Sequence, residues 1–203
     1  MTTPRDLLIV VVEVMPDQPV EQGNLSLALA GAELIDLLQA QTVRLDDDQI
    51  VPTGRSAPGD RLLENASSSL ARQAPYESVD NWLWRRGRNL SATYVAGLEA
   101  EGEFTRQRGR HRNPFRAGQL VLADSPARSD AEARWDSDEP VLTRLAATLG
   151  IHGRQATEVA GAVDDSVAVV LAAVEDAVRQ LEFERQRRAI EEAAYDNVWR
   201  DPQ

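Results

Sequence analysis

Apolar residues recur at helical spacing along most of the chain. Between residues 26 and 38 they fall three or four positions apart, and the same spacing returns in the segments 62–70 and 167–181. A stripe of this period predicts helices that bury one face. The segments that we predict as helices are 26–38, 60–73, 75–84, 90–100, 141–149 and 164–199.

Capping residues support several of these boundaries. Asp60, and either Asp164 or Asp165, can accept hydrogen bonds from free N–H groups in the first turn of a helix. Pro75 suits a first turn because its missing N–H is not needed there. Gly102 follows the segment 90–100 and can end that helix in a left-handed conformation.

Two short hairpins interrupt the helical pattern. The segments 42–45 and 49–51 flank a polar turn of three aspartates and predict two short strands. Farther along, the arginine-rich segment 106–116 precedes the strand-like segment 119–123, which predicts a β-hairpin with a basic arm and tip. The apolar run 7–15 fits either a strand or a helix, because a short run does not reveal its period.

These elements predict a mainly α fold. At 203 residues, of which 42% are hydrophobic, the chain can form one compact helical domain. We expect this domain at residues 1–181, with a protruding β-hairpin. Residues 182–203 are rich in charge, and we predict them to form a charged C-terminal helical extension.

Charge is distributed unevenly along the sequence. The net charge is −11, yet residues 85–116 contain eight arginines and three glutamates, a net charge of +5 that leaves −16 for the remainder. One cationic face on an acidic body directs a protein toward an anionic surface, and such a body disfavours nucleic-acid binding. The alternative is that the hairpin arginines only protect a strand edge from aggregation.

The candidate lipid-binding residues are one tryptophan and these eight arginines. Trp84 directly precedes two arginines, and an amphipathic ring beside guanidinium groups suits a membrane interface. Trp82 shares a helix face with Val79 and Leu83 and is expected in the core. The arginines are Arg85, Arg86, Arg88, Arg106, Arg108, Arg110, Arg112 and Arg116.

Residues for catalysis or metal binding are scarce. The chain has no cysteine, and its two histidines, His111 and His152, stand apart from other candidate groups. The run Asp46–Asp48 lacks the ligand spacing of a calcium loop. We therefore expect a protein without enzymatic activity, metal or cofactor. The run 7–15 is too short to span a membrane and lacks the features of a secretory signal, which favours a cytoplasmic location.

Five segments together resemble the Golgi phosphoprotein 3 family. In order they are 28–38 (ALAGAELIDLL), 43–51, 58–66 (PGDRLLENA), 79–82 (VDNW) and 98–102 (LEAEG), and the resemblance covers about residues 5–181. It implies a mostly helical domain with a protruding hairpin, in which the run 7–15 is a helix. It also implies binding of phosphatidylinositol 4-phosphate, contact of the hairpin with a membrane or another subunit, and an adaptor role for the tails of membrane enzymes.

The resemblance further implies which positions would line the lipid pocket. Where the family has a tryptophan before its first core helix, this chain has Glu21 and Gln22, and Ala30 stands where that helix carries an arginine. Of two arginines on a later helix, Arg88 matches one, and Ser91 stands at the position of the other.

Two hypotheses follow from the sequence. The first is a peripheral membrane adaptor at the inner face of a membrane, which binds anionic phospholipid headgroups and protein clients. The second is a cytoplasmic protein-interaction module that self-associates through its hairpin and has lost lipid binding. A nucleic-acid binder that contacts phosphates through the arginine-rich hairpin is a third alternative, which the acidic body disfavours, so nucleic acid is not an expected partner.

Overall fold

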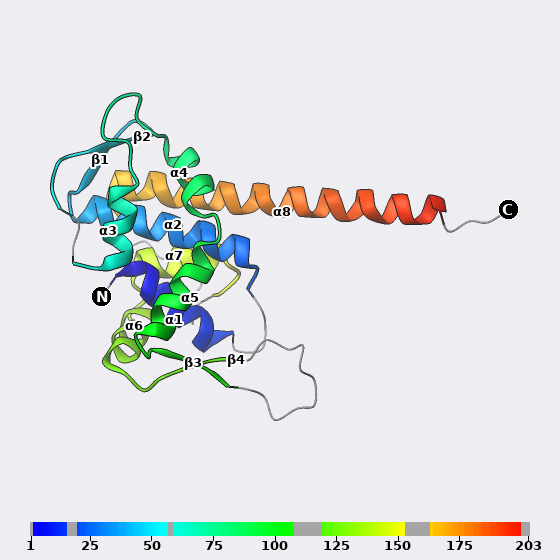
Figure 1. Cartoon of the computed structure of the whole chain (residues 1–203), viewed down its shortest axis with the longest axis horizontal. Coiled ribbons are helices and arrows are strands. Elements are labelled where there is room, and N and C mark those ends of the chain that lie inside the picture. The colour runs from blue at the N-terminus through cyan, green and yellow to red at the C-terminus, as the bar shows by residue number, and fades with distance from the viewer. Residues whose placement is uncertain (1, 16–19, 57–58, 108–118, 153–162, 200–203) are drawn as a thin grey trace.

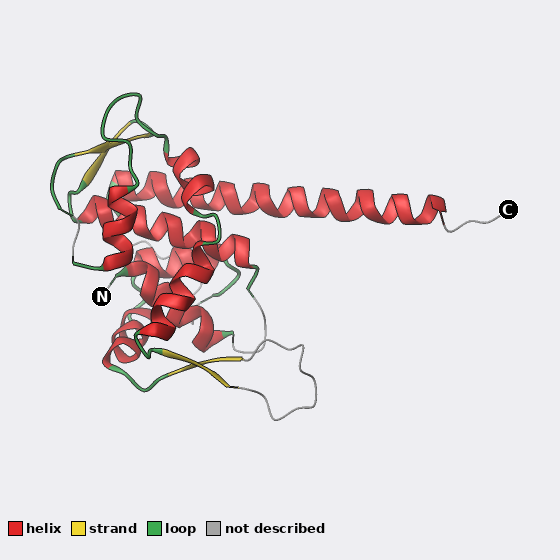
Figure 2. Ribbon diagram, in the orientation of Figure 1, coloured by secondary structure: helices red, strands yellow, loops and turns green. Residues whose placement is uncertain are grey.

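The computed structural model describes residues 2–15, 20–56, 59–107, 119–152 and 163–199, with the backbone alone for 106, 107, 119 and 194–199. Within these ranges, eight helices and two antiparallel hairpins form the fold, which confirms the mainly α fold with a β-hairpin (Figures 1 and 2). The helices are α1 (Thr3–Val14), α2 (Gln22–Gln39), α3 (Arg61–Ser68), α4 (Val79–Arg86), α5 (Leu90–Ala100), α6 (Pro126–Asp136), α7 (Pro140–Thr148) and α8 (Asp165–Trp199).

Helix α2 lies at the centre of the body. It packs against α1, α4, α5 and α8, and every residue from Asn24 to Ile35 is buried. Small residues allow this close packing: a Cβ atom on Gly31 would lie 2.3 Å from Cγ2 of Val174 on α8. The helix predicted at residues 26–38 is therefore confirmed, and burial on all sides explains its high apolar content.

The first apolar run forms α1. Its residues Leu7 to Val11 are buried, and the helix packs against α2, α6 and α7. Because neighbours cover this run on several sides, its sequence shows neither a clear helical stripe nor an alternation. The helix that the family resemblance implied is confirmed.

Capping confirms three predicted helix ends. Asp60 accepts hydrogen bonds from the N–H groups of Leu62 and Leu63 at the start of α3. Asp164 accepts one from the N–H of Ser166 at 2.9 Å, so it is Asp164 that caps α8. Gly102 follows α5 with a φ of +81°.

Helix α3 is shorter than predicted. It ends at Ser68 rather than at residue 73. The hydroxyls of Ser68 and Ser69 donate to the carbonyls of Asn65 and Ala66, and such local bonds compete with continuation of a helix.

Helix α4 begins later than predicted. It starts at Val79 instead of Pro75, and Ser78 accepts a hydrogen bond from the N–H of Asn81 as its cap. The N–H of Ile50 donates to the carbonyl of Glu77, so the residues before α4 bond to the first hairpin instead of entering a helix.

Helix α6 was not predicted from the sequence. Ser125 caps it, and of its eleven residues only Ala131 is fully buried. The helix therefore carries no apolar stripe that a periodicity argument could detect.

Both predicted hairpins are present, but the first strand of the second one comprises residues 104–107 and so begins before the basic arm predicted at 106–116. Strands β1 (Val43–Asp46) and β2 (Gln49–Pro52) pair through a tight turn in which Asp47 has a φ of +53°. Strand β3 (Phe104–Gln107) pairs with β4 (Gln119–Leu122), and Phe104 is buried against α5. The predicted basic tip lies outside the described residues.

Helix α8 has a buried part and a projecting part. Its first half buries an apolar stripe that ends near Val178, with Leu181 still in contact with the core. Beyond Leu181 the helix extends away from the body (Figure 1), and Phe183 and Ile190 are 65% and 70% exposed. The domain boundary predicted at residue 181 falls inside this continuous helix. In the parts of the chain described, none of the helices combines the length and hydrophobicity that a membrane span requires.

Candidate functional site

The end of α4 positions four of the predicted lipid-binding residues. Trp84, Arg85 and Arg86 form its last turn. Arg88 directly follows Gly87, the C-cap of the helix. Consecutive helical side chains point about 100° apart, so neighbouring arginines on one turn face different surroundings. Because α4 packs against α2 and α8, one of the two adjacent arginines faces the interior.

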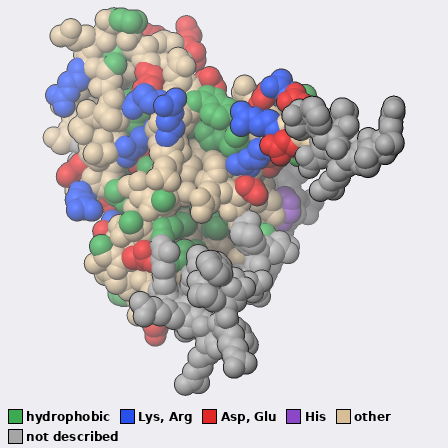
Figure 3. All heavy atoms as spheres, turned by 45° about the vertical axis from the view of Figure 1, so that its right-hand side comes forward, with side chains coloured by type: hydrophobic (Ala, Val, Ile, Leu, Met, Phe, Trp, Pro, Cys, Tyr) green, Lys and Arg blue, Asp and Glu red, His purple; other side chains and the backbone are tan. Residues whose placement is uncertain are grey.

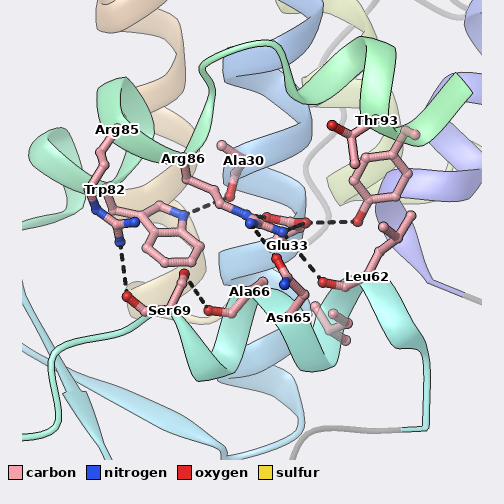
Figure 4. Close-up of polar contacts among 12 residues, drawn as sticks. Ala30, Glu33, Leu62, Asn65, Ala66, Ser69, Trp82, Arg85, Arg86 and Thr93 are labelled. Atoms are coloured by element: carbon pink, nitrogen blue, oxygen red, sulfur yellow. Dashed lines mark hydrogen bonds and ion pairs between the residues drawn. The ribbon is translucent and has the colours of Figure 1, made fainter. Parts of the chain in front are cut away.

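Arg86 is that residue. Its Nε and Nη2 donate to the two carboxylate oxygens of Glu33 at 2.7 and 2.9 Å, and its Nη1 donates to Asn65 at 2.8 Å (Figure 4). The hydroxyl of Tyr94 donates to the same carboxylate at 3.0 Å. The side chain of Glu33 is fully buried, and that of Arg86 is 13% exposed. Arg86 thus binds a buried carboxylate and joins α4 to α2 and α3.

Burial dominates the electrostatics of this network. It raises the pKa of Glu33, while the hydrogen bond and the charge of Arg86 act in the opposite direction. The pKa of Tyr94 is raised as well, first by burial and then by the negative charge of Glu33. The protonation states of Glu33 and Tyr94 therefore depend on each other and on the charge of Arg86.

Arg85 and Trp84 lie on the outer side of α4. The Arg85 Nε and Nη2 donate to Glu77 at 2.6 and 2.7 Å, and its guanidinium lies 5.2 Å from the ring centroid of Trp82. Its side chain remains 44% exposed. Trp84 is half-buried, and its indole N–H donates to Asp80 at 3.2 Å. Trp82 is fully buried, as predicted.

Arg88 lies in the turn between α4 and α5. It is exposed, and no ion pair joins it to another described residue. We call Trp84, Arg85 and Arg88 the α4 surface. Figure 3 shows basic side chains on both sides of a hydrophobic area, where the body meets the projecting part of α8.

The hairpin arginines cannot be added to this surface from the described residues. Arg106 belongs to β3, where the backbone alone is described, and Arg108, Arg110, Arg112 and Arg116 lie outside the described ranges. The α4 surface precedes α5 and β3 follows it, and eleven helical residues span about 16 Å. The described chain thus places the α4 surface and strand β3 at opposite ends of α5.

A comparison with known families decides the relationship. A family model described as Golgi phosphoprotein 3 (GPP34) matches residues 4–198, nearly the whole chain. The chain belongs to the Golgi phosphoprotein 3 family. The match extends beyond the segments that carried the resemblance and includes most of α8. No curated protein sequence matches the chain significantly.

Two positions at which the sequence resemblance implied lipid-pocket residues are buried in this member of the Golgi phosphoprotein 3 family. Ala30 is fully buried, and its carbonyl accepts the indole N–H of Trp82 at 3.0 Å. Ser91 is 5% exposed, and its N–H and hydroxyl both bond to the hydroxyl of Ser26, at 3.0 and 2.9 Å. At these positions small neutral residues join α2 to α4 and α5. Arg88, at a third position, remains exposed.

The sequence did not reveal the contacts that hold the base of the projecting helix. Asn24 on α2 donates to Glu182 at 2.8 Å and accepts from Arg185 at 2.9 Å, and Arg185 also lies 3.5 Å from Glu21. These partners are about 160 residues apart in the chain, so no local pattern signals them. They place the first turn of α2 beneath the point where α8 leaves the body.

Proposed function

We propose that this member of the Golgi phosphoprotein 3 family is a peripheral membrane adaptor, which contacts anionic phospholipid headgroups through the α4 surface and the hairpin arginines. The observation that carries the proposal is that Arg85 and Arg88 are both exposed and Trp84 is half-buried at the end of α4, on a chain whose remaining segments are strongly acidic. Family membership supports an adaptor that recruits protein clients, and phosphatidylinositol 4-phosphate as one lipid that it binds.

The buried pocket positions favour recognition of surface charge over recognition of one headgroup. Ala30 and Ser91 offer no charged group to a lipid phosphate, whereas Arg85 and Arg88 are accessible. An arginine close to an anionic membrane contributes about 1 kcal/mol, and salt screens this attraction. Several arginines together would hold the protein reversibly, and more weakly as the salt concentration rises.

A second function is favoured by the same buried positions. If lipid binding has been lost with the pocket arginines, the protein is a cytoplasmic interaction module that self-associates through its hairpin. Charge reversal of Arg108, Arg110 and Arg112 would then change the oligomeric state without any effect on vesicles. Light scattering and sedimentation of the same triple variant therefore separate the two functions.

Charge reversal on the α4 surface tests the proposal. We expect Arg85→Glu combined with Arg88→Glu to weaken binding to anionic vesicles at least about tenfold, because two attractions of about 1 kcal/mol become repulsions. The matched control is Arg44→Glu combined with Arg179→Glu, which has the same net charge and changes two exposed arginines on other elements. Equal weakening by the control would contradict a local lipid-contacting surface.

A further inference from the structure

An acidic hollow lies at the C-terminal end of α2, the end that is farther from the α4 surface. It has a volume of about 540 Å³ and opens between α1, α2 and α6. Its polar lining comes from residues far apart in the sequence. These are Thr3, Asp6, Asp36, Gln39, Asp130 and Arg134.

One carboxylate oxygen of Asp6 has no hydrogen-bond partner among the described residues. Its side chain is fully buried, and its Oδ2 accepts a hydrogen bond from Arg134. Its Oδ1 is buried and has no partner within the described chain. Arg134 also binds Glu139 at 2.9 Å, so one guanidinium serves two carboxylates. An unpaired buried acceptor is costly, which leaves Asp6 ready to accept a further donor.

Asp36 brings a second carboxylate to the hollow. Its Oδ2 accepts the N–H of Thr3 at 2.8 Å, and Asp130 stands exposed on α6 across the opening. The side chains that line the hollow carry three negative charges against the single positive charge of Arg134. In the described residues, no three acidic or histidine side chains are placed to hold a metal ion together. An organic cation with several N–H donors can instead reach carboxylates that lie apart.

Titration of Asp36 checks the electrostatics of the hollow. Burial raises its pKa to about 6. The hydrogen bond from Thr3 and the positive charge of Arg134 lower this pKa in part, and the negative charge of Asp6 raises it further. Because the folded-state pKa lies above the unfolded value of about 3.9, this group lowers stability as the pH rises from about 4 to 6, with no further loss above that. Carboxyl NMR should give a midpoint near 6. A midpoint near the unfolded value would show a solvated carboxylate.

We propose that this hollow binds the guanidinium or ammonium group of a cationic ligand, with Asp6 and Asp36 as the main acceptors and Asp130 at the rim. The positive group would reach the free oxygen of Asp6 after a shift of the side chains that now cover it, and it would offset part of the net negative charge of the hollow. A planar guanidinium can donate to two carboxylates at once, which suits this arrangement.

The hollow is well separated from the α4 surface. Asp36 follows Gln22 by fourteen residues on the same helix, which is about 21 Å along its axis. The carbonyl of Gln22 accepts the hydroxyl of Ser91, which ties the start of α2 to the start of α5 near Arg88. Figure 1 shows α2 running across the body between these two ends. The cation site therefore stands independently of the proposed lipid contact.

The test is an NMR titration of the full-length protein with agmatine, which carries a guanidinium and an ammonium group. Hexamethonium is the control, because it has the same charge but no N–H donor. We expect agmatine to give saturable shifts at the amides of residues around the hollow, such as Gln39 and Asp130, and hexamethonium to give none. Asp36→Asn should weaken agmatine binding about tenfold, since it removes a charged acceptor.

Two variants keep the outcome decisive. Asp130→Ala alters an exposed residue of the rim and should weaken binding with the fold intact, whereas Asp47→Asn in the β1–β2 turn should leave binding unchanged. Binding of acetyl-arginine amide as tightly as agmatine would identify a protein side chain as the source of the cation, and its failure would identify a free amine. Absence of saturable shifts, an equal response to hexamethonium, or unchanged binding in both hollow variants would overturn the proposal.

Discussion

Replacing Arg86 with alanine is expected to lower the free energy of unfolding by about 3–5 kcal/mol at neutral pH. The change leaves the carboxylate of Glu33 fully buried without its cation, and among the described residues only the hydroxyl of Tyr94 is still bonded to it. Urea denaturation measures the loss. The loss should be smaller at acidic pH, because an unpaired Glu33 can then be protonated and its buried charge disappears.

Two comparisons show whether this loss comes from the buried pair. Arg179→Ala removes an exposed ion pair on α8 and should cost less than about 1 kcal/mol. Glu33→Leu combined with Arg86→Met removes both charges and should be closer to the wild type than Arg86→Ala is. A cost for Arg86→Ala no greater than that for Arg179→Ala would contradict the buried network.

Gly31→Ala is expected to destabilise the protein by about 1–3 kcal/mol through overpacking. A Cβ atom at this position would lie 2.3 Å from Cγ2 of Val174, far inside van der Waals contact, where α2 meets α8. Helix propensity alone would favour alanine, so the sign of the effect separates packing from propensity. Thermal or urea denaturation gives the result.

The packing origin of this effect can be isolated. Gly59→Ala is the matched control, because a Cβ atom at Gly59 meets nothing within 4 Å, and it should be nearly neutral. In a Val174→Ala background, Gly31→Ala should cost less than in the wild type, because the opposing methyl group is gone. An equal cost in both backgrounds would mean that α2 and α8 do not touch at this point.

The sequence predicted the fold best where a helix buries one face and its apolar residues therefore recur at helical spacing. Helix α8 carries a one-sided stripe, and Asp60 and Asp164 cap helices as expected. Helix α6 buries too little for a stripe to show. Helix α4 begins at Val79 because the residues before it bond to a hairpin nearly 30 positions earlier. Bonds between residues so far apart cannot be predicted from the pattern of a short sequence segment.

The candidate site was predicted only in outline. The sequence identified Trp82 as core and placed arginines around it, but it could not distinguish Arg85 from Arg86. Their difference depends on Glu33, which lies 53 positions before Arg86 and appears in the sequence as one polar residue in an apolar helix.

The acidic hollow left no signal in the sequence. Asp6 and Asp36 lie 30 residues apart on different helices, and only the packing of α1 against α2 brings them to one opening. The hairpin arginines remain a prediction from sequence.

Sedimentation of the purified protein with vesicles tests the central claim most directly. The vesicles contain neutral lipid alone, neutral lipid with a generic anionic lipid, or neutral lipid with phosphatidylinositol 4-phosphate at equal charge, each at low and at physiological salt. Binding by surface charge predicts that the protein pellets with both anionic vesicles at low salt, less at physiological salt, and not with neutral vesicles. Absence from every anionic pellet at low salt would contradict a membrane-binding function and leave the protein-interaction module.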